Sequence, residues 1–263
     1  MQPLNTQSPE QLRQLIRAGQ FNGPTAGLAA GFAQANLLIV KQAQAYDFLL
    51  FCQRNPQACP LLDVTDVGSA ISQYAAPGAD IRSDLPLYRL YRHGELCEEV
   101  SDISAHWQDD MVAFLIGCSF SFESALLAND VPVRHIEDNH NVPMYISNRQ
   151  CRPAGQFSGP MVVSMRPMPA DKVIRATQVT SRFPGVHGAP VHIGDPAALG
   201  ITDINKPDFG CASHIHEGEV PVFWACGVTP QAVAMHSKPE LAITHAPGHM
   251  LICDLRNEQL GVF

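Results

Sequence analysis

Charge is scarce in this sequence, and no run of either sign occurs. Of the 263 residues only 16% are charged, and the formal net charge is -8 at pH 7. The phosphates of nucleic acid attract a basic face, which an acidic chain with scattered Lys and Arg does not provide. The composition therefore argues against nucleic acid as a partner. It also excludes a polybasic segment for a membrane surface.

Long apolar runs are missing as well. No stretch approaches the roughly 20 residues of a transmembrane helix. The opening residues, Met1 to Thr6, have neither the basic nor the apolar part of a secretory signal. We therefore expect a cytoplasmic protein with no membrane partner. An apolar content of 46% is sufficient for a compact core and argues against disorder.

Several signature motifs are absent. None of the eight cysteines forms a Cys-x-x-Cys pair, and most stand in apolar surroundings. Without an export signal they are expected to be reduced core thiols rather than a zinc or disulfide framework. There is no Gly-x-Gly-x-x-Gly, no phosphate-binding Gly-x-x-x-x-Gly-Lys-Ser/Thr and no Gly-x-Ser-x-Gly. The sequence thus gives no support to a nucleotide cofactor or a serine hydrolase, and we expect no cofactor.

Short apolar segments do occur, separated by 19 glycines and 21 prolines. Helices are predicted to begin near Ser8, Thr25, Lys41, Ser121 and Thr229 from capping residues and apolar spacing. Residues 109–116 fit either a helix or a strand. Strands are predicted at residues 61–64, 87–91, 96–100, 161–165, 173–179, 191–193, 220–224, 242–244 and 250–255.

This alternation predicts an α/β fold with a mixed sheet. We expect a larger layered domain, residues 1–75 and 145–263, which carries a smaller two-layer α/β domain at residues 76–144. No Gly/Ser-rich linker marks the boundaries.

Parts of the sequence recur. Residues 18–24 (AGQFNGP) return as 154–160 (AGQFSGP), and residues 114–121 (FLIGCSFS) are echoed by 222–229 (VFWACGVT). The offsets differ, so this is not a solenoid with a fixed period. We interpret the second pair as a strand–turn–helix unit that is used twice.

The turn at residues 117–121 is the sharpest candidate for chemistry. Backbone N–H groups at the start of a helix can hold an anion or an oxyanion, here near Ser119 and Ser121. Glu123, in the first turn, could act as a general acid or base. The structural alternative is that Ser121 and Glu123 only cap a helix. Cys118 is either a packing residue beside the substrate or a nucleophile with a lowered pKa.

Arginines and a second amide-rich turn are candidates for holding a carboxylate. Arg166 and Arg182 stand at the ends of apolar segments, where a guanidinium can bind a carboxylate through two hydrogen bonds. Structural ion pairs are the alternative for both. Thr25, in residues 23–27, could also bind substrate, although a Gly-Pro pair is commonly only a turn.

Eleven histidines invite two hypotheses. His187 and His192 are candidates for proton transfer because imidazole titrates near neutral pH. The alternative is that each bonds a loop carbonyl. His214 and His216 would face one side of a strand, as zinc ligands can. No His-Glu-x-x-His motif and no acidic cluster accompanies them, so we expect no metal.

Together these segments resemble the bacterial hydro-lyases related to the D-glutamate cyclase family. The resemblance runs from about Arg17 to Leu255 and rests on residues 23–27 (GPTAG), 59–63 (CPLLD), 79–82 (ADIR), 114–122, 141–145 (NVPMY), 180–183 (TSRF), 187–196, 219–231 and 243–249. It implies an α/β architecture in two parts and a carbon–oxygen lyase that eliminates water. Through the mitochondrial relative it implies cyclisation of D-glutamate to 5-oxo-D-proline.

We therefore expect a lyase that acts on a small amino- or hydroxy-dicarboxylic acid, with a small-molecule carboxylate as its partner. The expected catalytic residues are Glu123, Ser119, Ser121, His187 and His192, and the expected substrate-binding residues are Thr25, Arg166, Arg182 and Cys118. Two alternatives stay open: a metal-assisted hydrolase or hydratase that uses the histidines, and a non-catalytic carboxylate-binding module. Assembly into a homo-oligomer is also left open.

Overall fold

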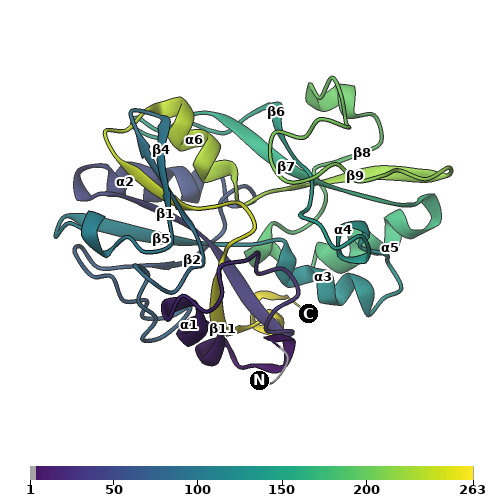
Figure 1. Ribbon diagram of the computed structural model, residues 1–263. Helices are drawn as coiled ribbons and strands as arrows, with labels where there is room; N and C mark the ends of the chain where they lie inside the picture. Colours follow the sequence, from purple (N-terminus) through teal and green to yellow (C-terminus); the bar gives the residue numbers. More distant parts are fainter. Residues whose placement is uncertain (1–3, 263) are drawn as a thin grey trace.

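A computed structural model describes residues 4–262 of the chain, which form two sheets with helices packed against them (Figure 1). The larger sheet has the order β2-β5-β1-β10-β3-β4, with β11 also paired to β1. Its strands are β1 (Phe32–Lys41), β2 (Leu61–Val64), β3 (Tyr88–Arg92), β4 (Glu95–Val100), β5 (Met111–Gly117), β10 (Ala242–His245) and β11 (Leu251–Arg256). All of its strand pairs are antiparallel.

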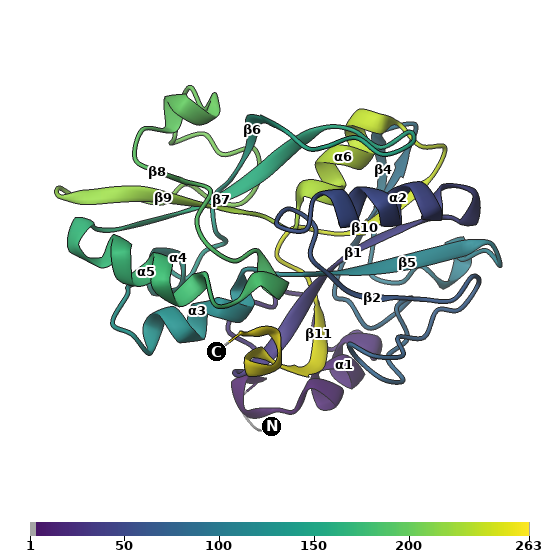
Figure 2. The ribbon, with the colours of Figure 1, turned by 180° about the vertical axis from the view of Figure 1, so that it is seen from behind.

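The smaller sheet has the order β6-β7-β9-β8. Its strands are β6 (Met144–Gln150), β7 (Pro160–Pro169), β8 (His192–Ile193) and β9 (Glu219–Ala225). The helices are α1 (Pro9–Arg17), α2 (Gln42–Arg54), α3 (Phe120–Leu127), α4 (Arg134–Glu137), α5 (Val173–Thr180) and α6 (Thr229–Ser237). Figures 1 and 2 show α3, α4 and α5 together on one side of this sheet. No helix within residues 4–262 is long and apolar enough to span a bilayer.

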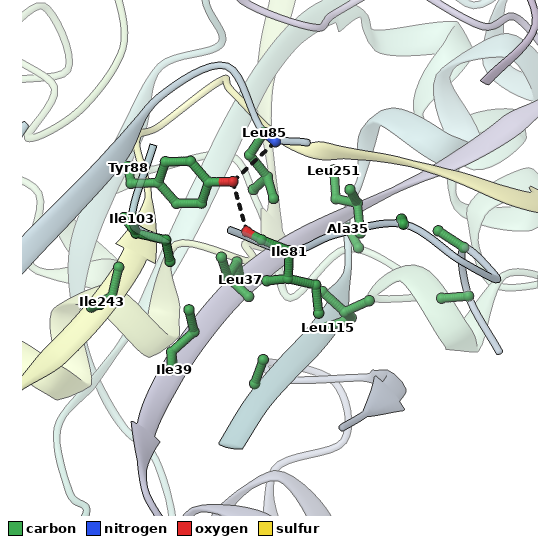
Figure 3. Close-up of a cluster of buried hydrophobic side chains, with 14 of the residues drawn as sticks. Ala35, Leu37, Ile39, Ile81, Leu85, Tyr88, Ile103, Leu115, Ile243 and Leu251 are labelled. Atoms are coloured by element: carbon green, nitrogen blue, oxygen red, sulfur yellow. Dashed lines mark hydrogen bonds between the residues drawn. The ribbon is translucent and has the colours of Figure 1, made fainter. Parts of the chain in front are cut away.

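Strand β1 organises the larger sheet because both of its edges and both of its faces are covered. One edge pairs with β5, and the other pairs first with β11 and then with β10. Leu37 and Ile39 belong to one apolar cluster, whereas Leu38 and Val40 belong to a second on the opposite face. The first cluster includes Tyr88, whose hydroxyl donates to the Ile81 carbonyl (2.6 Å; Figure 3). The second is covered by α2 and α6 (Figure 2).

Two predicted elements are wrong. The helix expected from Thr25 is absent, and its second half is strand β1, because residues 33–40 are all buried and no polar face exists for a helix. The strand expected at 173–179 is helix α5, which buries Ala176 and Thr180 while Ile174 is exposed. Most of the ambiguous segment at 109–116 belongs to strand β5. The α/β class and the other predicted elements are confirmed, including the capping box of Ser8 and Gln11.

The proposed division into residues 1–75 with 145–263 and an insertion at 76–144 stays a prediction. Strands from both proposed parts, β1 and β5, pair over seven residue pairs within one sheet.

One carboxylate holds residues 72–75, within the long segment between β2 and β3. Asp63 Oδ2 accepts hydrogen bonds from the Ser72 hydroxyl and from the backbone N–H groups of residues 73, 74 and 75 (2.7 to 3.2 Å). Burial favours the neutral carboxyl group, but these donors outweigh it and lower the pKa of Asp63.

The two strand–turn–helix units meet at Asn36 of β1. Its side-chain amide donates to the carbonyls of Ile116 and Gly117 (3.3 and 2.9 Å), at the end of β5. A Cβ atom on Gly227, between β9 and α6, would lie 1.8 Å from the same amide nitrogen. A Cβ on Gly117 would lie 2.2 Å from the carbonyl oxygen of Gly185. Both turns therefore have glycine where the neighbouring chain leaves no room.

We predict that Gly227→Ala lowers the free energy of unfolding by about 1–3 kcal/mol, because the new methyl group must displace Asn36. Urea denaturation of the purified variant measures this. Gly23→Ala is the matched control, since its Cβ would stand 3.4 Å from the Phe21 ring. Equal stability of the two variants would contradict the close approach at Asn36.

Candidate active site

The predicted strand–turn–helix at residues 114–127 is present, but its serines do not cap the helix as expected. Ser119 is the N-cap residue and makes no side-chain capping bond. Its hydroxyl instead accepts a hydrogen bond from Arg166 Nη2 (3.1 Å). Ser121 lies inside the first turn, where its hydroxyl accepts from the backbone N–H of Gln34 (3.3 Å).

Arg166 is the centre of a buried polar cluster. It lies on β7, is fully buried, and packs against the rings of Phe122 and Trp224, with its guanidinium carbon 5.4 and 5.5 Å from their centroids. Its Nη1 donates to the Ser164 hydroxyl (3.1 Å), and its Nε donates to Glu123 Oε1 (3.1 Å). Nη2 also donates to that oxygen. A guanidinium at this depth requires such partners, because an unpaired buried charge is very costly.

A second basic group completes the cluster. His135, on the single turn of α4, is buried, and its Nε2 lies 3.0 Å from Glu123 Oε1. This contact is an ion pair by distance, although its angles do not meet those of a hydrogen bond. The His135 ring stacks on Phe120 at 5.9 Å. Residues from α3, α4 and β7 thus converge on one carboxylate oxygen.

The charges in this cluster determine the state of Glu123. Burial favours the protonated carboxyl group, but the nearby basic groups of His135 and Arg166 and the hydrogen bonds from Arg166 outweigh it, so the pKa of Glu123 is lowered. Both partners act on Oε1. Among residues 4–262, no hydrogen bond reaches Oε2, and 4% of the Glu123 side chain is exposed. Glu123 is therefore a carboxylate whose Oε1 is occupied by Arg166 and His135, while Oε2 can accept a proton.

Cys118 and its counterpart in the second turn, Cys226, are both buried. Burial raises the pKa of the Cys118 thiol far above its ordinary range, and it raises that of Cys226 to about 11. A thiol in this state is a poor nucleophile at neutral pH. The environment thus favours packing over the alternative of a reactive Cys118.

The structure brings together only part of the predicted site. Glu123, Ser119 and Arg166 are in contact, whereas Ser121 faces Gln34. Thr25 is buried among structural bonds: its hydroxyl donates to Gln34 Oε1 (2.7 Å) and accepts from Met250 N (3.1 Å). Arg182 is exposed and lines a cavity between α3 and α5.

The two histidines predicted to transfer protons differ from one another. His192 is half-buried on β8, with Nε2 2.7 Å from the Asp195 carbonyl. His187 is fully buried in a left-handed conformation (φ 84°), and its Nδ1 donates to the Gln57 carbonyl (2.8 Å). Burial lowers the pKa of His187 to about 4, so the ring is neutral at neutral pH.

The proposed metal ligands are not on a strand. His214 and His216 are exposed in an irregular segment, with ring centroids 4.8 Å apart. In the part of the chain that the structure describes, no group of three or more His, Cys, Asp or Glu side chains is placed to hold a metal ion.

Two members of the cluster were missed from sequence. Ser164 stands two residues before Arg166, and this spacing on a strand places both side chains on one face. The sequence spacing of Ser164 and Arg166 could therefore have predicted that Ser164 belongs to the site. His135 joins the site from a helix of only four residues, for which no periodic pattern exists.

Comparison with known proteins identifies the class. Residues 112–254 match the family model described as D-glutamate cyclase, and this range holds the whole cluster. The chain therefore belongs to the D-glutamate cyclase family.

Curated bacterial relatives narrow this further. A protein of Stutzerimonas stutzeri is 74% identical over 97% of this chain and 96% of its own. Proteins of Bacillus pumilus and Bacillus subtilis are 68% and 64% identical over at least 97% of each chain. All three bear the name "putative hydro-lyase". This chain is a member of that hydro-lyase group, which is a class of carbon–oxygen lyases. A solved nitrogen repressor-like protein of Methanococcus jannaschii aligns over 93% of this chain and 97% of its own, with TM-score 0.38 and 8% identity.

We predict that His187 makes stability fall as the pH drops from 6.5 towards 4. In this window the imidazole of the unfolded chain binds a proton and the buried ring does not, so acid favours unfolding. The full effect is about 3 kcal/mol. Glu123 also loses its stabilising effect in acid, but only below the pKa of a glutamate in the unfolded chain. Its contribution therefore falls at lower pH than that of His187.

His187→Asn tests this, since asparagine tolerates the left-handed backbone and does not titrate. Urea denaturation from pH 7 to pH 4 should show a shallower loss than in the wild type. His236→Asn, at an exposed position on α6, should keep the wild-type slope. A wild-type slope in His187→Asn would mean that the folded protein protonates this ring normally.

Proposed function

We propose that the chain eliminates water from a small amino- or hydroxy-dicarboxylic acid at the Glu123–Arg166–His135 cluster, with cyclisation of D-glutamate to 5-oxo-D-proline as the leading reaction. The observation that carries the proposal is the buried Glu123 carboxylate, held between two basic side chains at the start of a helix. Family membership supports the type of reaction, because dehydration is what the relatives' name describes.

The proposed reaction needs no co-reactant. The α-amine nitrogen attacks the γ-carboxyl carbon, a C–N bond forms, and a C–O bond breaks. The substrate ammonium gives up two protons, and the departing oxygen collects two to leave as water. The enzyme must therefore accept protons on one side of the reacting carbon and return them on the other.

Glu123 and His135 are suited to this transfer. Oε2 of Glu123 can take a proton from the substrate ammonium, while Nε2 of His135 stands beside Oε1 to complete a relay. When Glu123 becomes neutral, Arg166 loses its counter-charge and becomes available to a substrate carboxylate. Backbone N–H groups near Ser119 would polarise the reacting carboxyl group.

Access to the cluster requires movement. Arg166, Glu123 and His135 each have at most 4% of the side chain exposed. The four-residue helix α4 supplies His135 and forms part of the cover. In our proposal this short turn moves aside when substrate binds, as small mobile elements do in many enzymes.

Incubation of the pure protein with D-glutamate is the direct test. We expect 5-oxo-D-proline by chiral chromatography, with L-glutamate as the stereochemical control and hydroxy- and amino-dicarboxylates as a panel. Thermal stabilisation by these acids without any turnover would instead favour the carboxylate-binding module. Turnover of another panel member would correct the substrate and retain the reaction class.

We predict that Glu123→Gln lowers kcat by about 10²–10⁴-fold, because glutamine keeps the shape but cannot carry the proton. Cys118→Ala is the matched neighbour and should retain most of the activity. Circular dichroism establishes that both variants are folded. Near-normal activity in Glu123→Gln would remove this turn from the mechanism, and loss of activity in Cys118→Ala would restore the thioester alternative.

A further inference from the structure

A cavity of about 650 Å³ lies between α3 and α5, away from the Glu123 cluster. From α5 and the turn after it come Arg175, Gln178, Val179 and Arg182, and from α3 and the turn after it come Ala125 and Asn129. Positions three and four apart occupy one helix face, so α5 presents Arg175 and Gln178 to the groove, and Arg182 joins them from the turn that follows. Helix pairs ordinarily fill such a groove with apolar side chains.

The charge in this cavity has one sign. None of the described residues that line it is acidic. Arg175 and Arg182 are exposed, and within residues 4–262 neither belongs to an ion pair. The side-chain contact of Arg175 is a long one, to Asn129 Oδ1 at 3.5 Å. The described lining of the cavity is therefore positively charged, in a chain of net charge -8.

We propose that this cavity binds a small metabolite with two anionic groups, carboxylate or phosphate, one at each arginine. Arg175 lies on α5, and Arg182 lies in the turn that follows the helix. Arginine side chains are long and flexible, so the two guanidiniums can approach each other to bind a short dianion or remain apart to bind a longer one. Guanidiniums bind both kinds of oxyanion through paired N–H donors, while Gln178 and Asn129 add neutral amides.

This site is distinct from the proposed active site and does not depend on the proposed function. The two share helix α3 but use opposite faces of it. Glu123 points towards β7, whereas Ala125 and Asn129, two and six residues later, point towards α5. A ligand in the cavity would therefore contact the helix whose first turn carries Glu123.

Titration calorimetry with the full-length protein tests the proposal, with glutarate and inorganic phosphate as probes and chloride at equal ionic strength as the baseline. We expect saturable binding of at least one dianion. The arm that binds more tightly distinguishes a carboxylate from a phosphate ligand. Binding no stronger than that of chloride would overturn the site.

Variants locate the binding. Arg175→Gln with Arg182→Gln should weaken it at least tenfold. Arg92→Gln with Arg152→Gln removes the same charge from exposed positions outside the cavity and should leave binding unchanged. Glu123→Gln should also bind normally, which separates this site from the catalytic proposal. Equal weakening in both double variants would indicate general charge attraction, and normal binding in the cavity variant would place the ligand elsewhere. Either result overturns the proposal.

Discussion

A fully buried guanidinium is the constraint on which the structure depends. Arg166 belongs to the smaller sheet, while its counter-charge, Glu123, is on the helix that follows a strand of the larger sheet. Because a buried charge without its partner costs several kcal/mol, about 3–5 in measured cases, the two sheets must meet with these side chains aligned. The same requirement positions Ser119, Ser164 and His135 around one carboxylate. The contact that packs the two sheets together therefore also assembles the candidate site.

Short local sequence patterns predict many of the helices and turns of the fold. The capping box at Ser8, the turn after β5 and the Thr229–Pro230 helix start are all signals within a few residues. The echo between residues 114–121 and 222–229 corresponds to two strand–turn–helix units that meet at Asn36. Glu123 and Arg166 were each selected for their position at a turn or strand, and the fold makes them partners. Their pairing is a consequence of tertiary structure, and neither segment alone contains a pattern that predicts it.

The errors have a common physical origin. Residues 33–40 have no exposed face because three neighbouring strands and two apolar clusters surround β1. Periodicity cannot distinguish a strand that is buried on all sides from a buried helix. In α5, β-branched residues suggested a strand, but burial of Ala176 and Thr180 follows the helical period. His135 was missed because a helix of one turn has no pattern. Arg182 lines a cavity between α3 and α5, apart from the Glu123 cluster, and its predicted role in substrate binding stays a prediction.

The single carboxylate oxygen of Asp63 has a kinetic meaning beyond its contacts. It gathers four donors from residues 72–75 and so closes this part of the segment onto β2. The same segment packs Ile81 and Leu85 into the core, and the carbonyl of Ala75 accepts a hydrogen bond from the backbone N–H of Asp254 on β11. Its amide protons should therefore exchange as slowly as those of the larger sheet and together with them, because the loop cannot open while the core stays packed. The Asp63 carboxylate thus turns a segment without helix or strand into a part of the cooperative core.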